Sequence, residues 1–263
     1  MIVIDSGLGG IAVARALRRQ APGLSFAYLA DTAGFPYGSR SAGEIMARAV
    51  AIVEALAGRV ELSTIVLACN TLSTLALAAL RTQFPHYHFV GAVPAIKVAA
   101  AQAQRFTLLA TPNTAQSEYS KQLISAFAAH CVVDAYGAPN LARYAEAQLL
   151  GETVDAAAWR SELAPAFFDD ARGKTEAVIL GCTHYPLVLA QLEQAAPWPV
   201  TWIDASDAIA RRALALPHAS VPAQAFVTAA TDVVRYEAIF HREGFGEVSA
   251  LGVSGRLPAA VQA

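Results

Sequence analysis

Residues 65–71 read Ile-Val-Leu-Ala-Cys-Asn-Thr, and residues 178–184 read Val-Ile-Leu-Gly-Cys-Thr-His. In each stretch, three aliphatic residues and one small residue lead directly to a cysteine, and polar residues follow it. A short, continuous apolar run before a turn is typical of a parallel strand that is buried on both faces. Ligands of open α/β sheets bind beyond the carboxyl ends of such strands. The sequence therefore predicts that Cys69 and Cys182 each lie where a ligand would bind.

The rest of the chain alternates strand patterns with helical patterns. Besides the two cysteine strands, strands are expected at 2–4, 26–30, 88–90, 107–110, 131–133, 198–203 and 226–228. Helices are expected to end near residues 20, 57, 84, 104, 129, 150, 171, 195, 214 and 241. This alternation predicts an α/β fold with mainly parallel sheets.

The order of polar residues after the strands repeats between the two halves of the chain. The matched pairs are Ser6 with Thr111, Asp31 with Asp134, and Cys69 with Cys182. The two cysteines are 182 − 69 = 113 residues apart, which is about the length of one small domain. We therefore expect two pseudo-symmetric open α/β domains that face each other, with the active site in the cleft between them, where small-molecule sites commonly lie.

Composition excludes several classes of protein. With 55% hydrophobic and 15% charged residues in 263, the chain is expected to fold around a sizeable core. A net charge of −2 without a cluster of Lys or Arg argues against nucleic acid as a required partner. No apolar run approaches the roughly 18 residues of a membrane span. Residues 1–10 do not read as a signal peptide.

Cysteine usage points to a cytoplasmic protein without a metal site. Three widely spaced cysteines do not describe a disulfide framework, so a reducing compartment is expected. Their spacing also differs from the closely spaced Cys and His pairs of zinc sites. Cys131, at the start of a strand without polar neighbours, is interpreted as a small hydrophobic core residue.

The matched pair Cys69 and Cys182 calls for a different interpretation. Both precede predicted helix N-termini, which lower the pKa of a thiol. A redox disulfide usually uses the closely spaced C-x-x-C pattern, and nucleophilic hydrolysis needs one cysteine with a histidine. Inversion at a carbon needs two equivalent groups, one to remove a proton from one face and one to deliver a proton to the other. This third option accounts for the most features.

Polar residues around the two cysteines favour the same chemistry. Asp5 and His184 are positioned to orient the catalytic groups, although a capping role for Asp5 and a hydrogen bond within the turn for His184 remain alternatives. Hydrogen-bond donors at predicted helix starts suit a carboxylate ligand. The same residues can also cap the helices, and the two roles are compatible. These donors are Ser6, Asn70, Thr71 and Thr183.

Three further features of the sequence bear on the site. Tyr37 and Gly38 lie in a proline-bounded loop at a strand end, which fits either a ligand contact or a plain turn. Residues 7–12 do not complete the pattern G-x-G-x-x-G, because Ala12 occupies its last position. A dinucleotide cofactor is therefore not expected. Glu146, within a helical stretch, reads by itself as solvated surface.

Several motifs together resemble the glutamate racemases of the aspartate/glutamate racemase superfamily. The matching segments are 5–10 (Asp-Ser-Gly-Leu-Gly-Gly), 36–41 (Pro-Tyr-Gly-Ser-Arg-Ser), 68–71 (Ala-Cys-Asn-Thr), 90–97, 181–186 (Gly-Cys-Thr-His-Tyr-Pro) and 204–206. The resemblance extends from residue 2 to about residue 209, and the last forty or so residues are less informative. Leu72 departs from it, because the family usually has a small residue after Cys-Asn-Thr.

The resemblance implies a cofactor-independent enzyme that interconverts L- and D-glutamate and supplies D-glutamate for peptidoglycan and cell-wall biogenesis. It implies that Cys69 and Cys182 are the two acid/base groups. It implies the following substrate-binding residues: Asp5, Ser6, Tyr37, Gly38, Asn70, Thr71, Thr183 and His184. It also implies carboxylate contacts from Thr111 and Thr114, and a role for Glu146 near one cysteine.

The resemblance also implies two α/β domains, with the chain returning to the first: 1–92 plus 205–263, and 93–204. Glutamate is the expected small-molecule partner, and a homodimer is compatible with such families. Three alternatives remain open: a racemase for aspartate or another acidic amino acid, a single-cysteine hydrolase or lyase of similar fold, and a non-enzymatic amino-acid-binding protein.

Overall fold

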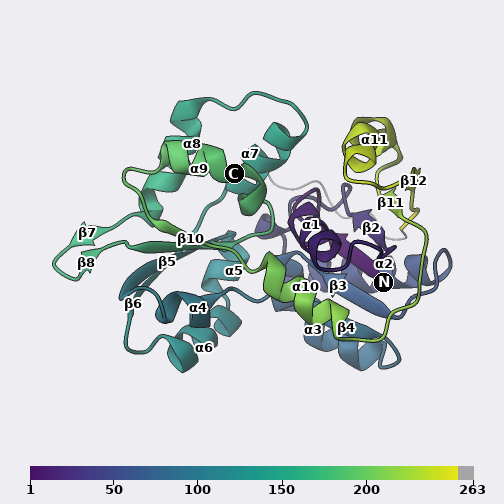
Figure 1. The fold of residues 1–263 in the computed structure, drawn as a ribbon, viewed down its shortest axis with the longest axis horizontal. Helices are drawn as coiled ribbons and strands as arrows, with labels where there is room; N and C mark the ends of the chain where they lie inside the picture. The colour runs from purple at the N-terminus through teal and green to yellow at the C-terminus, as the bar shows by residue number, and fades with distance from the viewer. Residues whose placement is uncertain (254–263) are drawn as a thin grey trace. The chain divides into compact units, whose positions relative to one another are not determined.

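The computed structural model describes residues 1–253, and the chain divides into two compact units. Unit 1 comprises Met1–Ala92 and the chain from Ser206 on, and unit 2 comprises Val93–Ala205. In Figure 1 the purple and blue beginning of the chain and its yellow-green end belong to unit 1, whereas the teal and green middle forms unit 2. Unit 1 is therefore discontinuous in sequence, and unit 2 is continuous.

Unit 1 is built on a parallel sheet in the order β12-β11-β2-β1-β3-β4. Its strands are β1 (Ile2–Asp5), β2 (Ala27–Ala30), β3 (Thr64–Leu67), β4 (His88–Gly91), β11 (Gln224–Val227) and β12 (Glu247–Ala250). Its helices are α1 (Ile11–Gln20), α2 (Ala42–Ala57), α3 (Asn70–Gln83), α10 (Ser206–Leu214) and α11 (Val233–Arg242), with 3₁₀ turns at Tyr37–Ser39 and Ala230–Asp232. Every residue of β1, β2 and β3 is buried, as expected for the centre of a parallel sheet.

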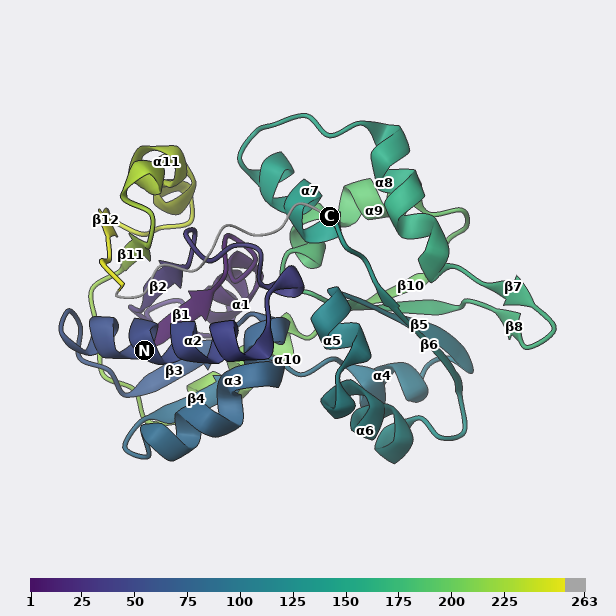
Figure 2. The same ribbon diagram turned by 180° about the vertical axis from the view of Figure 1, so that it is seen from behind.

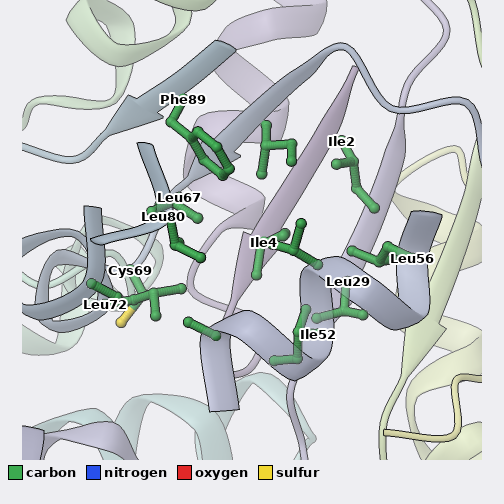
Figure 3. Packing of buried hydrophobic residues seen from close by; sticks show 14 of the residues in the cluster. Ile2, Ile4, Leu29, Ile52, Leu56, Leu67, Cys69, Leu72, Leu80 and Phe89 are labelled. Carbon is green, nitrogen blue, oxygen red and sulfur yellow. The ribbon is translucent and has the colours of Figure 1, made fainter. Parts of the chain in front are cut away.

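Helices cover both faces of this sheet. In Figure 1, α1 and α10 lie in front of the strands, and in Figure 2, seen from behind, α2 and α3 lie in front. Alternate strand residues face α2 and α3, so Ile4 and Leu67 pack with Ile52 and Leu72 in one core cluster. Figure 3 shows this cluster, with Cys69 beside Leu72.

Unit 2 has a smaller parallel sheet in the order β10-β9-β5-β6 and a two-stranded antiparallel hairpin. The sheet strands are β5 (Arg105–Ala110), β6 (Val132–Gly137), β9 (Ala177–Gly181) and β10 (Thr201–Ile203), and the hairpin is formed by β7 (Asp169–Asp170) and β8 (Gly173–Lys174). The helices are α4 (Ile96–Ala100), α5 (Pro112–Gln116), α6 (Glu118–Phe127), α7 (Leu141–Leu149), α8 (Ala156–Leu163) and α9 (Leu189–Ala195), with 3₁₀ turns at Ala164–Ala166 and Tyr185–Val188. The hairpin projects from the sheet in both ribbon views.

Two apolar clusters lie on the two faces of this smaller sheet. Leu109 and Leu180 pack in a cluster with residues of α7, α8 and α9, whereas Phe106 and Leu108 pack in a cluster with residues of α4 and α6. Both faces of the parallel sheet are thus covered, which explains why β9 reads as a continuous apolar run and why every residue of β5 is buried.

The four strands of unit 2 repeat the topology of the first four strands of unit 1. The two sheets contain the orders β2-β1-β3-β4 and β6-β5-β9-β10. In both, the first strand of the unit lies between the second and the third, and the fourth lies beyond the third. Ile4 pairs with Leu67 and Ala110 pairs with Gly181. Continuing each register therefore places Ser6 level with Cys69, and Thr111 level with Cys182. The α/β class with parallel sheets, predicted from the sequence, is confirmed.

The register corrects one of the matched pairs. Asp31 follows β2 directly, but Asp134 lies inside β6, where it pairs with Thr107. In unit 1, Asp31 is level with Ser6 in the strand register. The corresponding residue of unit 2, which is level with Thr111, is Ala138. The strand runs past Asp134 because the carboxylate accepts hydrogen bonds from Arg105 at 3.2 and 3.3 Å, so the charge is paired on the neighbouring strand.

Among the elements that differ from the expectation are a helix end and a strand. The helix expected to end near residue 171 ends at Leu163, because Pro165 begins a 3₁₀ turn and the hairpin follows. Strand β12 was not predicted at all, since residues 247–250 carry only a weak apolar pattern.

Substitution of Gly181 by Ala tests the tight packing at the end of β9. An added Cβ would lie 2.9 Å from Ala110 Cβ and 3.0 Å from Leu109 O, so neighbouring strands would have to shift. We expect the free energy of unfolding, measured by urea denaturation, to fall by about 1–3 kcal/mol. Gly23→Ala is the control, because nothing lies within 4 Å of its added Cβ. Equal unfolding midpoints for the two variants would contradict this packing.

Candidate active site

Both matched cysteines follow a central strand of their own sheet and are buried. Cys69 follows β3 after Ala68 and is 7% exposed, and Cys182 follows β9 directly and is 6% exposed. Neither forms a disulfide. Cys131, in contrast, lies at the edge of a core cluster, and its thiol donates to the carbonyl of Ala103 at 3.5 Å.

The chain after the two cysteines differs. Cys69 is the N-cap residue of α3, so the first backbone N–H groups of a long helix lie next to it. After Cys182 the chain makes the 3₁₀ turn Tyr185–Val188, and α9 begins only at Leu189. Pro186 lies in the first positions of this turn, where its missing N–H is tolerated. The prediction of a helix N-terminus at both cysteines is therefore correct for Cys69 and wrong for Cys182.

A histidine and a glutamate accompany Cys182 instead. His184 Nδ1 lies 3.7 Å from Cys182 Sγ, and His184 Nε2 lies 2.8 Å from Glu146 Oε2. Glu146 comes from α7 and is 4% exposed, so the solvated position that its helical context predicted is wrong. The three side chains form a buried Glu–His–Cys chain of polar contacts.

The charges in this chain fix the protonation of His184. Burial lowers the pKa of the imidazole, but hydrogen bonds to Cys182 and Glu146 and their negative charges outweigh it and raise the pKa of His184 well above its usual 6.5. A protonated His184 donates from both ring nitrogens, to Glu146 on one side and towards sulfur on the other. It therefore stabilises negative charge on the Cys182 sulfur.

Asp5 organises the turn after β1. Its Oδ1 accepts a hydrogen bond from Gly7 N at 3.0 Å, and Tyr28 Oη donates to Gly7 O at 2.8 Å. The N-cap of α1 is Gly10, which has no side-chain cap. Asp5 thus holds the turn that carries Ser6, rather than capping the first helix. Both side chains are buried at the carboxyl end of the central strand.

The remaining predicted donors lie in the first turns after β3, β5 and β9. Asn70 and Thr71 begin α3 and are buried, as is Thr183 after Cys182. Thr111 Oγ1 donates to Thr114 Oγ1 at 3.1 Å in the first turn of α5. In unit 1 the fold brings the predicted polar residues to the carboxyl edge that holds Cys69, and in unit 2 to the edge that holds Cys182.

Tyr37 lies in the 3₁₀ turn Tyr37–Ser39, in the same core cluster as Cys69. Its hydroxyl donates to Asp31 Oδ2 at 2.5 Å. Burial, the negative charge and hydrogen bond of Asp31, and the negative charge of Cys69 raise the pKa of Tyr37 well above 10. Tyr37 therefore keeps its proton. Gly38, next to it in the turn, is half-buried.

Asp31 and Arg48 are contacts that sequence reasoning missed. Arg48 Nη2 donates to Asp31 Oδ1 at 2.6 Å, and both side chains are buried. The sequence does contain a signal for a buried charge at Arg48. Arg48 lies three residues after Ile45 and four before Ile52, both of which are buried, so it interrupts the apolar stripe of α2.

Among residues 1–253, no group of three or more His, Cys, Asp or Glu side chains is arranged to hold a metal ion. Among the helices of the same residues, none has both the length and the apolar character that a bilayer crossing requires.

Comparisons with known proteins give consistent results. The model of the Asp/Glu/hydantoin racemase family matches residues 9–213. A glutamate racemase of Sinorhizobium medicae is 44% identical over 218 residues, which are 82% of this chain and 80% of the relative.

Solved structures of similar fold are also glutamate racemases. The Escherichia coli enzyme in complex with L-glutamate and the activator UDP-MurNAc-Ala has a TM-score of 0.89 and 37% identity, covering 97% of this chain and 98% of the other. The Thermus thermophilus enzyme in complex with β-chloro-D-alanine has a TM-score of 0.73 and 29% identity, covering 95% and 96% of the two chains.

The raised pKa of His184 is testable by NMR of ¹³C-labelled histidine, with the signal assigned from its loss in His184→Asn. We expect an imidazolium signal at pH 7, because Glu146 and Cys182 hold the proton, and a lower pKa in Glu146→Gln. The same shift stabilises the fold fully below about pH 6.5, and this contribution disappears as pH rises through the raised pKa. A neutral imidazole at pH 7 would contradict the buried Glu–His–Cys arrangement.

Proposed function

Because the chain belongs to the Asp/Glu/hydantoin racemase family, we propose that it interconverts L- and D-glutamate with Cys69 and Cys182 as the two proton-transfer groups. One observation carries this proposal. The two thiols occupy equivalent register positions, each level with a hydroxyl residue, in two sheets of the same strand order. Transfer of a proton to and from opposite faces of one carbon needs two such chemically equivalent groups.

The proposed reaction balances without another reactant. The thiolate of one cysteine takes the α-proton and becomes a thiol, and the electron pair of the broken C–H bond is delocalised into the α-carboxylate. The thiol of the other cysteine then donates its proton to the opposite face and becomes a thiolate. The product is the mirror image of the substrate, and the enzyme is left in the reverse protonation state, ready for the reverse reaction.

The difficulty of this reaction is the weak acidity of the α-proton. The negative charge that develops on the carboxylate needs preorganised donors. We assign this role to the first-turn N–H groups of α3 and the side chains of Ser6, Asn70 and Thr71 around Cys69, with Thr183 beside Cys182. His184 and Glu146 would hold Cys182 and support its thiolate form.

A biological role follows from the product. We propose that the D-glutamate supplies peptidoglycan synthesis, in line with the family resemblance, and that the enzyme works in the cytoplasm. A reducing compartment would keep both buried thiols free, as this chemistry requires. Aspartate remains the alternative substrate, because the length of the side chain that a site accepts depends on the shape of the bound state.

The test is ¹H NMR of L-glutamate and, separately, D-glutamate in D₂O with the enzyme. We expect the α-proton signal of both enantiomers to disappear, with product of the opposite hand. Cys69→Ser and Cys182→Ser should each slow racemisation by at least about 100-fold, because each removes one acid/base group. Each should also block exchange mainly from one enantiomer, and the two variants from different ones.

Cys131→Ser is the matched control. Its thiol contacts the carbonyl groups of Ala100 and Ala103 beside a core cluster of unit 2, so the variant should keep full activity. UDP-MurNAc-Ala, the activator in the Escherichia coli relative, is added in a parallel series so that a low basal rate is not mistaken for inactivity. Exchange with aspartate but not with glutamate would show that aspartate is the substrate. Full activity of Cys182→Ser would refute the two-thiol mechanism.

A further inference from the structure

We propose that Asp31 and Arg48 are positioning residues that act through Tyr37 to fix the place of Cys69 for proton transfer. This inference rests on the proposed racemase function, because it assigns a role within that reaction. It concerns unit 1 alone and involves side chains from the end of β2, the loop after it and α2.

Asp31 is the centre of a dense hydrogen-bond network. Its Oδ1 accepts from Arg48 Nη2 at 2.6 Å and from Thr228 Oγ1 at 2.6 Å. Its Oδ2 accepts from Arg48 Nε at 3.0 Å and from Tyr37 Oη at 2.5 Å. One fully buried carboxylate therefore joins β2, the loop of Tyr37, α2 and the residue that follows β11.

The same aspartate also shapes the loop backbone between residues 31 and 40. Gly34 N and Phe35 N donate to Asp31 O at 2.9 and 3.0 Å. The loop packs so closely on the carboxylate that a Cβ on Gly34 would lie 2.1 Å from Asp31 Oδ2. Arg40 Nε closes the loop by donating to Gly34 O at 2.6 Å. Tyr37 is thus held by the loop and by its own hydroxyl.

Stability of the scaffold does not explain this network. Burial of an Arg–Asp pair costs desolvation free energy, so such pairs often add little net stability. Unit 2 forms the same strand order with Ala138 at the level that Asp31 occupies in unit 1, so the sheet does not require a carboxylate there. What distinguishes unit 1 is the loop that presents Tyr37.

Tyr37 connects the network to Cys69. Its ring packs in the core cluster of Cys69 and Leu72, and the negative charge of Cys69 contributes to the raised pKa of its hydroxyl. Tyr37 thus stays a neutral group in the same cluster as the thiol, in a turn that contacts α3, and cannot itself exchange protons with the substrate near neutral pH. Its role is to limit where the sulfur lies. Without the Asp31 carboxylate the hydroxyl loses this short hydrogen bond, and the ring is held less firmly.

Exchange of the α-proton in D₂O separates this role from general structural damage. The two enantiomers have equal free energies in water, so any defect lowers kcat/KM for net racemisation equally in both directions. Exchange without inversion is not bound by this constraint. A defect confined to Cys69 therefore suppresses exchange from the enantiomer that Cys69 deprotonates, and leaves exchange from the other enantiomer, which Cys182 serves.

The variants are Tyr37→Phe, Asp31→Asn and Arg48→Lys. Tyr37→Phe and Asp31→Asn should slow exchange from the enantiomer that is affected in Cys69→Ser by at least about tenfold, since small displacements of reacting groups have large effects on rate. Exchange from the other enantiomer should change much less. Arg48→Lys, which keeps the charge but loses the two-pronged contact, should lie between these variants and the unmodified enzyme.

Asp134→Asn is the matched control. Asp134 also pairs with a buried arginine, Arg105, but in unit 2, and it lies inside β6 rather than at the carboxyl end. It should reduce stability without an enantiomer-specific effect on exchange. If Asp31→Asn fails to fold, Tyr37→Phe alone tests the inference. This variant keeps the aromatic ring and leaves Asp31 paired with Arg48 and Thr228.

The outcomes separate this inference from the proposed function. Unmodified enzyme that exchanges neither enantiomer of glutamate or aspartate would refute the function and the inference together. Normal exchange in Tyr37→Phe and Asp31→Asn, or equal loss from both enantiomers in folded variants, would refute the inference and leave the two-thiol mechanism standing. Loss that follows the pattern of Cys69→Ser supports the assignment.

Discussion

The structure depends on the constraint that a parallel strand must be buried on both faces while its carboxyl end opens towards polar groups. In each unit the central strand, β1 or β5, pairs with a strand on either side, and helices cover both faces. Polar side chains therefore have one place to gather, which is the edge where the strands end. Ser6 and Cys69 come level at one such edge, and Thr111 and Cys182 at the other, through strand register alone.

The two units solve the same chemical problem differently. Cys182 has a cation beside it, since Glu146 holds His184 in its protonated form. Cys69 has a helix N-terminus and shares its core cluster with a neutral tyrosine, whose acceptor Asp31 is paired with Arg48. The two units thus share the register position of the thiols but not their surroundings. In the proposed mechanism, the two thiols have equivalent roles in unequal electrostatic environments.

Sequence reasoning succeeded where the pattern is local. The cysteine strands, the alternation of strands and helices, and α2 with its boundaries follow from apolar runs and capping residues. It failed where a single proline or a distant partner decides the outcome. Pro165 ended a helix early, and Pro186 replaced an expected helix start with a 3₁₀ turn. The contact of Glu146 with His184 joins residues 38 positions apart, which no periodicity reveals.

The discontinuity of unit 1 has a consequence for synthesis on the ribosome. All of unit 2 is translated before β11, which pairs with β2 and is followed at once by Thr228, one of the donors to Asp31. Domains generally fold as units during translation, so the continuous middle of the chain can fold while the first sheet still lacks its last two strands. The nascent chain therefore carries Cys69 for most of its elongation without the segment that completes the network around Tyr37. The segment that completes this network is thus added only after the whole of unit 2.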